Sequence, residues 1–411
     1  DEAERMLGVT EYDDDGPADL LLKEYGESIG VGDTYRRTRV GVFLGQPGKT
    51  VADPYFDGDG PDRTGCIKCG SCMVGCRHGA KNTLRKNYLW FAEKLGVKIF
   101  SERSVTDIKP LDARGATGYE VTHQKSGALG KRSAEKLRAR GVVVAAGALG
   151  TNRLLQRCKL GGSLPNISDR LGYVVRTNSE SIMAVMAPKD YPDDFTHSIA
   201  ITSSIYTDPA THIEVVTYGK GGDSQSLLFN LMIEAGKRGT RPLHFLAAAA
   251  KNPKAALAAW KIKDTSRRVI ILLVMQSIDN AMRLKVKMRL PNGNVALTTE
   301  QDPDNPNPDF VPAAYDAAKW FARRMGGVAY SGVTEGIFAI PSTAHILGGA
   351  VIGASPETGV VDSRNHVFGY ENLLVTDGAA VPANVGANPS LTITALAERA
   401  MTFIPANAPA V

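Results

Sequence analysis

Two residues near the C-terminus, His345 and Asn388, have side chains suited to chemistry at a hydroxyl group. A neutral imidazole can accept the hydroxyl proton, and an amide can hold the oxygen while hydride leaves the carbon. Taken alone, His345 is more simply a buried, hydrogen-bonded histidine, and Asn388 is more simply a helix cap. Both lie in glycine-containing segments, 344–349 and 386–393, whose order favours a shared site. We therefore expect His345 and Asn388 to be a catalytic pair.

Two neighbouring segments predict contacts to a flavin. Residues 373–376 form a short apolar run, predicted to be a buried strand, which ends at Asp377-Gly378. A carboxylate in such a turn can receive a ribityl or ribose hydroxyl. Asn388-Pro389 is a natural helix start, with Asn near the cap and Pro in the first turn. The free N–H groups and positive partial charge of a helix N-terminus suit the electron-rich pyrimidine end of a reduced flavin.

A third segment, residues 142–158, predicts the other end of a cofactor site. Residues 142–146 (VVVAA) predict a fully buried strand, and a helix is expected from Leu149 to Cys158. Gly147 and Ala148 stand between them. A buried strand that passes through glycine into a helix is how parallel α/β domains receive cofactors.

Four of the five cysteines are clustered, with the spacing C-x2-C-x2-C-x3-C from Cys66 through Cys69 and Cys72 to Cys76. This spacing is typical of a ferredoxin iron–sulfur loop, although no proline follows the fourth cysteine. Three of these residues with a fourth ligand, either Cys76 or the remote Cys158, are an alternative set. Buried, inert thiols are a second interpretation. Zinc is a third, but the steps are tighter than the usual zinc spacing.

The composition excludes several classes of protein. Hydrophobic residues make up 43% and charged residues 22% of the 411 positions, as in an ordinary globular protein and unlike a disordered, collagen-like or disulfide-stapled chain. The net charge of +5 is too mild to indicate a nucleic-acid partner. The longest wholly apolar run, residues 269–275, has seven residues, and roughly 18 are needed to span a bilayer. Cytoplasmic and cell-envelope-associated locations both stay open.

The remaining patterns predict the elements that must position these residues. Strand composition recurs at 181–187, 198–206, 212–218 and 269–275, which indicates a separate antiparallel sheet. A hairpin is expected from 283–289 and 295–298 around Pro291-Asn292-Gly293-Asn294. Further strands are expected at 97–101, 104–109, 119–124 and 137–140, and helices at 17–25, 86–95, 243–263 (interrupted at Pro253), 313–325 and 394–402.

Together these motifs resemble the glucose–methanol–choline (GMC) family of flavoprotein oxidoreductases, and within it the actinobacterial, cholesterol-oxidase-like branch. The resemblance extends over nearly the whole chain. It rests on four stretches: residues 65–84, which contain the cysteines, residues 145–151 (AAGALGT), residues 275–280 (MQSIDN) and the C-terminal motifs.

The resemblance implies a fold class, a cofactor and a reaction. We expect an α+β or α/β protein, with an incomplete Rossmann-like FAD-binding domain and a substrate domain built on an antiparallel sheet with helices. The expected activity is oxidation of the CH–OH group of a sterol or another bulky apolar alcohol, by hydride transfer to FAD. The electrons would then pass to oxygen or to an electron carrier.

The resemblance also implies roles for single residues. His345 matches the family's base, and Asn388 matches the position that is Asn in cholesterol- and choline-type enzymes but His in sugar-type enzymes. Glu214 and Glu335 are candidates for a proton shuttle, as in some relatives, but a lone Glu is more often structural, and neither is included among the predicted site residues. The implied FAD-binding residues are Gly147, Ala148, Asp377, Gly378, Asn388, Pro389, Ser390, Leu391 and Thr392.

One departure from the family changes the expectation. The family begins with a strand, a Gly-x-Gly-x-x-Gly turn and a helix that hold the FAD pyrophosphate, and no segment here fits. Three readings follow: a working oxidoreductase, a fragment or subunit that needs a partner polypeptide to complete its FAD site, and an iron–sulfur electron-transfer protein. The expected division is a loop-rich region at 1–65, parts of the FAD-binding domain at 66–158 and 336–411, and the substrate-binding domain at 159–335.

Overall fold

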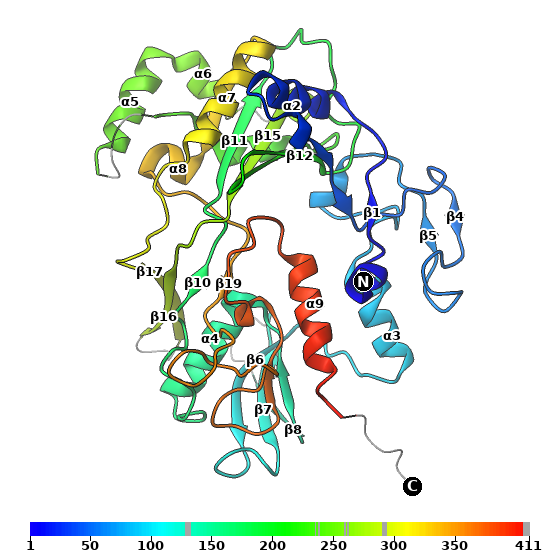
Figure 1. Ribbon diagram of the computed structural model, residues 1–411, viewed down its shortest axis with the longest axis vertical. Coiled ribbons are helices and arrows are strands. Elements are labelled where there is room, and N and C mark those ends of the chain that lie inside the picture. The colour runs from blue at the N-terminus through cyan, green and yellow to red at the C-terminus, as the bar shows by residue number, and fades with distance from the viewer. Residues whose placement is uncertain are drawn as a thin grey trace.

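The computed structural model describes residues 1–127, 133–234, 236, 239–258, 260, 263–289 and 294–405. The chain forms an upper lobe around a large sheet and a lower lobe around smaller sheets, with helix α9 (Ser390–Met401) beside the lower lobe on the side that faces the N-terminal segment (Figure 1). Antiparallel sheets, helices and one parallel strand pair occur together. This mixture confirms the predicted α+β class.

The upper lobe is organised by a seven-stranded sheet in which every neighbouring pair is antiparallel. Its order is β14 (Phe229–Leu231), β18 (Val328–Gly332), β11 (Ser181–Met186), β15 (Val269–Gln276), β13 (Thr211–Val216), β12 (Ile201–Asp208) and β2 (Arg36–Arg37). Four of these strands match the predicted ones within a few residues.

Both faces of this sheet are covered, because residues on alternate sides enter two different cores. One face packs on α2 (Pro17–Ser28) and α7 (Pro312–Met325). The other packs on α5 (Arg241–Lys251) and α6 (Pro253–Ala258). The first seven residues of the central strand β15 are apolar and buried, as expected for a strand covered on both faces.

The lower lobe contains the parallel pair. Strands β9 (Val142–Val144) and β20 (Leu373–Val375) lie side by side, and β9 leads into α4 (Gly147–Leu160). Beside them is the antiparallel sheet of β6 (Arg103–Pro110), β7 (Tyr119–Lys125) and β8 (Ala134–Ala139). Because β9 and β20 run in parallel, the turns that follow them meet at the same edge.

Shorter elements complete the described chain. A four-stranded sheet has the order β17 (Asn294–Gln301), β16 (Met282–Arg289), β10 (Val175–Arg176) and β19 (Leu347–Gly348). The other elements are α1 (Glu2–Leu7), β1 (Thr10–Glu11), η1 (Gly32–Thr34), β3 (Arg39–Val40), β4 (Thr50–Val51), β5 (Arg63–Thr64), η2 (Ser71–Met73), η3 (Leu84–Lys86), α3 (Tyr88–Lys94), η4 (Asp223–Leu228), α8 (Val333–Phe338) and η5 (Gly378–Ala380).

Two expectations need correction. No strand forms at 97–101, where the apolar side chains are exposed and lack a neighbouring strand to pair with. Strand β9 is not fully buried, since Val143 is 44% exposed on one side of a two-stranded sheet. The helix expected at 243–263 is interrupted at Pro253 as predicted, because proline cannot donate to the preceding turn.

The predicted hairpin is present as the pair β16–β17, whereas its turn at 290–293 lies outside the described residues. In the described part of the chain, no helix is long and apolar enough to cross a membrane.

Candidate active site

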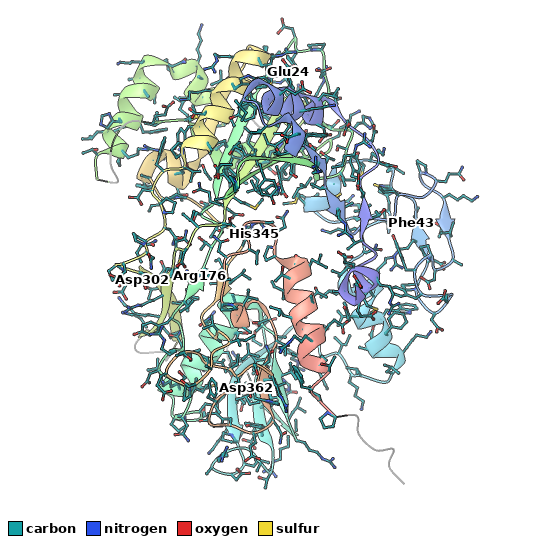
Figure 2. The ribbon with its side chains drawn as sticks, viewed as in Figure 1. Glu24, Phe43, Arg176, Asp302, His345 and Asp362 are labelled. Atoms are coloured by element: carbon teal, nitrogen blue, oxygen red, sulfur yellow. The ribbon has the colours of Figure 1, made fainter. Side chains whose placement is uncertain are left out.

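His345 lies between the two lobes, in the loop that joins α8 to β19 (Figure 2). Its imidazole Nδ1 is in close contact with the Oε1 atom of Glu180, a buried carboxylate directly before β11. The other oxygen of Glu180 accepts a hydrogen bond from the backbone N–H of Ala344 at 2.5 Å. Glu180 therefore fixes both the His345 ring and the backbone that carries it.

A second group competes for the same ring nitrogen. The side-chain nitrogen of Asn178 lies 3.2 Å from His345 Nδ1 and also donates to the carbonyl of Ala387 at 3.0 Å. A carboxylate can only accept, and a charge-assisted bond is the stronger one, so we assign the Nδ1 proton to the contact with Glu180. In that tautomer, Nε2 of His345 carries a lone pair and can act as a base.

Asn388, which precedes α9, is paired with a second buried carboxylate. Its side-chain nitrogen donates to both oxygens of Glu214 on β13, at 2.9 and 3.0 Å. Burial raises the pKa of Glu214 to about 7, against the opposing effects of the Asn388 hydrogen bond and of His345. Burial also lowers the pKa of neighbouring His212 to about 4, so its imidazole is neutral near pH 7.

The raised pKa of Glu214 predicts a pH-dependent change in stability for Glu214→Gln. The native state binds this proton more tightly than the unfolded state, so stability falls as the pH rises from about 4.5 to about 7. Above that window the cost is about 3 kcal/mol. We expect the glutamine variant to melt within about one degree of the parent at pH 5 and a few degrees higher at pH 8.

Thermal midpoints at the two pH values test this expectation. The control is Glu27→Gln, on the exposed side of α2, which should show the same midpoint as the parent at both values. An equal shift of Glu214→Gln at pH 5 and pH 8 would contradict it.

The polar pairs lie beside the apolar core on one face of the seven-stranded sheet. On β13, Glu214 is directly opposite Leu273 of β15, and both Val216 and Leu273 enter the core that packs against α5 and α6. The alternating residues Ile213 and Val215 face the opposite side. A carboxylate and an amide next to such a sheet face can hold the polar end of a molecule whose remainder is apolar.

The predicted cofactor turns meet at the ends of the parallel strands. Gly147 has a φ of +72°, and a Cβ added there would have no described heavy atom within 4 Å. Asp377, after β20, accepts from Thr151 of α4 at 2.5 Å and from the N–H of Ala379 at 2.8 Å. Gly147 thus combines a backbone conformation that favours glycine with open space, and the buried carboxylate of Asp377 lies nearby. This arrangement fits the adenosine and ribityl parts of FAD.

The start of α9 fits the flavin ring. The first hydrogen bond within the helix runs from Ile393 N–H to the carbonyl of Pro389, and no side chain in the described residues caps the helix. Helix geometry therefore leaves the N–H groups of Ser390, Leu391 and Thr392 without intrahelical acceptors. Ala148 is buried in α4, and Gly378 begins η5. Neither has a polar side chain, so each could contact the cofactor only through its backbone or by close packing.

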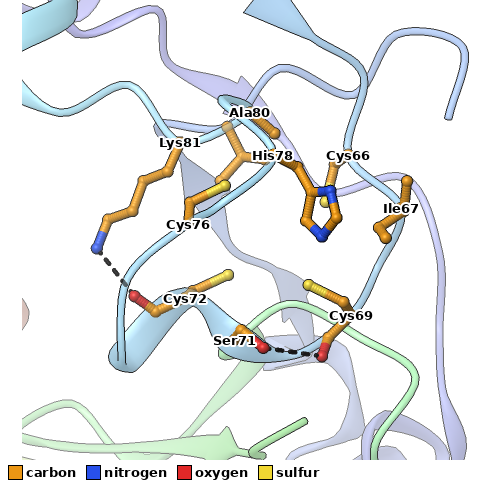
Figure 3. A pocket seen from close by; sticks show the side chains of 10 residues that line it. Cys66, Ile67, Cys69, Ser71, Cys72, Cys76, His78, Ala80 and Lys81 are labelled. Carbon is orange, nitrogen blue, oxygen red and sulfur yellow. Dashed lines mark hydrogen bonds between the residues drawn. The ribbon is translucent and has the colours of Figure 1, made fainter. Parts of the chain in front are cut away.

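The four clustered cysteines line one small pocket. Figure 3 shows the sulfurs of Cys66, Cys69, Cys72 and Cys76 turned toward a shared space. All four are free thiols. In the described part of the chain, no three His, Cys, Asp or Glu side chains are close enough to share a single metal ion.

Sequence reasoning proposed His345 and Asn388 but did not name the residues that contact His345. Glu180 and Asn178 belong to a wholly polar run, residues 177–181, which is nonetheless buried at the start of β11. A polar run leading directly into an apolar strand is the only local signal, because buried polar groups require partners. Glu214, considered but not included among the predicted site residues, lies in the site, whereas Glu335 is bonded to Ser181 instead.

Comparison with known proteins agrees with these features. The family model for the N-terminal part of GMC oxidoreductases matches residues 60–172, and that for the C-terminal part matches residues 334–397. A cholesterol oxidase of Acinetobacter baumannii is 47% identical over 98% of this chain and 73% of its own length. A cholesterol oxidase of Mycobacterium tuberculosis is 44% identical over 98% of this chain and 71% of its own.

A solved structure supports the fold alone. Pyridoxine 4-oxidase from Mesorbium loti superposes with a TM-score of 0.54 at 14% identity, covering 96% of this chain and 71% of that one. The sequence matches are far stronger, and they confirm the family resemblance and FAD as the cofactor. The chain therefore belongs to the GMC oxidoreductase family and is an FAD-dependent alcohol oxidoreductase.

Proposed function

We propose that this chain oxidises the CH–OH group of a sterol or another bulky apolar alcohol. The observation that carries the proposal is the joining of His345 to Glu180, and of Asn388 to Glu214, beside the apolar face of the seven-stranded sheet. The names of the relatives, cholesterol oxidases, support the substrate class. Neither lobe alone provides both the polar pairs and the cofactor turns.

In this proposal His345 and Asn388 act on the substrate hydroxyl. Nε2 of His345 takes the hydroxyl proton, and Glu180 stabilises the imidazolium that results, because its carboxylate contacts Nδ1. Asn388 has two N–H donors, so one can bind Glu214 while the other holds the substrate oxygen. FAD, when bound, accepts the hydride from the substrate carbon.

The chain's own residues would hold FAD at three places. Gly147 and Ala148 would approach the adenosine part, and Asp377 with Gly378 would bind a hydroxyl. The residues proposed for the ring are Asn388, Pro389, Ser390, Leu391 and Thr392. That a second polypeptide contributes to FAD binding stays a prediction, which the flavin content of the purified chain tests.

A substrate panel tests the proposed class. The flavin-loaded chain would be assayed with a sterol, a long-chain primary alcohol and glucose, using oxygen and then an artificial electron acceptor. We expect kcat/KM for the sterol to exceed that for glucose by at least about 100-fold, since a sugar would leave its hydroxyls unpaired against an apolar face. Preference for glucose would contradict the proposal. The acceptor that supports faster turnover would separate an oxidase from a dehydrogenase.

A further inference from the structure

We propose that Cys66, Cys69, Cys72 and Cys76 ligate a [4Fe–4S] cluster. The cysteine loop is built to bring its sulfurs to one place, as Figure 3 shows. Positive φ angles at Lys68 (53°), Gly70 (67°) and Gly75 (108°) reverse the backbone between the cysteines. Without those reversals, cysteines three residues apart in an extended chain would point to different sides.

The arrangement suits a cluster and not a single ion. Zinc requires its four ligands to meet at one centre, and the described side chains do not converge that closely. In an iron–sulfur cluster each thiolate binds a different iron, so the cluster's own iron and sulfide atoms separate the sulfurs. Four cysteines whose sulfurs turn toward one shared space match this arrangement of ligands.

Backbone N–H groups reach two of the four sulfurs, those of Cys66 and Cys76. The N–H of Lys68 donates to the sulfur of Cys66 at 3.4 Å, and backbone N–H groups of residues 78–81 interact with the sulfur of Cys76. The ammonium of Lys81 lies 3.3 Å from the carbonyl of Cys72, at the edge of the pocket. Hydrogen bonds from the backbone to sulfur stabilise a cluster and adjust its potential.

The cysteine loop is hydrogen-bonded to residues that flank β12 and β13, two strands of the sheet that carries the candidate active site. Gly70 donates to the carbonyl of Ser198 at 2.7 Å and accepts from the N–H of Gly219 at 3.0 Å. A Cβ on Gly70 would lie 2.5 Å from Gly219, so this close approach needs glycine. Gly219 is five residues after Glu214 along β13 and its continuation, which limits the separation of their Cα atoms to about 18 Å.

This placement, which rests on the proposed function, gives the cluster a task. Oxidation of one alcohol to a carbonyl releases two electrons and two protons. A [4Fe–4S] cluster gains one electron when it is reduced from the 2+ to the 1+ state and loses it again on reoxidation. Two such cycles would deliver both electrons to a one-electron acceptor of the carrier-protein class, while the protons leave to solvent.

The experiment is purification of the full chain without oxygen, followed by measurement of iron, acid-labile sulfide, zinc and flavin. We expect about four iron and four sulfide per chain, and an electron paramagnetic resonance signal after reduction by dithionite. The double variant Cys69→Ser/Cys72→Ser should lose iron at least about tenfold. Ser71→Ala, which alters the same η2 turn but no proposed ligand, should keep it.

The outcomes separate this inference from the proposed function. A folded, flavin-containing chain without iron and sulfide, even after reconstitution with both, would overturn the cluster and leave the alcohol oxidation intact. Zinc in place of iron would also overturn it. A chain with iron and sulfide that does not oxidise alcohols would instead contradict the proposed function alone. The metal content of the parent chain decides the matter even where the serine variants fail to fold.

Discussion

Replacing His345 with alanine is expected to lower kcat for alcohol oxidation by about 1000-fold, with flavin content unchanged. Glu180 contacts Nδ1 of this imidazole, and Asn178 links His345 to the carbonyl of Ala387, the residue before Asn388. A positioned general base contributes roughly 100- to 10,000-fold to a rate. The measurement is steady-state turnover with a sterol, together with the flavin absorbance of each purified variant.

A surface histidine supplies the control. His366 is half-exposed and lies 3.7 Å from the carboxylate of Asp362, so it also has an acidic neighbour but lies outside the proposed site. His366→Ala should keep nearly full turnover. If His345→Ala loses less than about tenfold, the proton acceptor is another group and the assignment of His345 is wrong.

The second large effect is expected for Glu180→Gln, which preserves shape but removes the charge. A glutamine amide can donate to Nδ1 of His345, which would move the imidazole proton to Nε2 and leave no lone pair facing the substrate. It would also remove the charge that stabilises the imidazolium. We expect kcat to fall about 100-fold with KM little changed, since the lost interaction strengthens only as the proton moves.

A matched control, Glu335 on α8, contacts the same strand. Glu335 is equally buried and accepts from Ser181, the residue next to Glu180, at 2.8 and 2.9 Å, yet it does not contact His345. Burial raises its pKa above the ordinary value for Glu. Glu335→Gln should therefore leave kcat within a fewfold of the parent. Equal losses in the two variants would indicate damage to the sheet and not a role in positioning His345.

The sequence predicts the candidate site well where the signal is local. Asp377 and the start of α9 follow from short runs whose turn and cap chemistry is readable without the fold. The strands at 212–218 and 269–275 follow from their β-branched, apolar composition. The pairing of His345 with Asn388 rests on the order of their glycine-containing segments and on the family resemblance, because no local pattern joins residues 43 positions apart.

The remaining parts depend on long-range packing. Glu180 and His345 are 165 positions apart, and Glu214 and Asn388 are 174 apart, so neither pair leaves a periodic signal. The false strand at 97–101 shows the converse case. Its composition favours a strand, but no neighbouring edge is available to pair with it, and burial in a sheet decides whether such a run forms one.

The central claim is that the chain oxidises a bulky apolar alcohol, with His345 as the base and Asn388 holding the substrate oxygen. Rapid anaerobic mixing tests this claim most directly. The flavin-loaded chain would be mixed with a sterol carrying either hydrogen or deuterium on its carbinol carbon, while flavin absorbance is followed. We predict that the flavin absorbance bleaches, that bleaching slows with the deuterated sterol, and that it is nearly absent in His345→Ala. Flavin that stays oxidised with sterols but bleaches with glucose, or that bleaches as fast without His345, would contradict it.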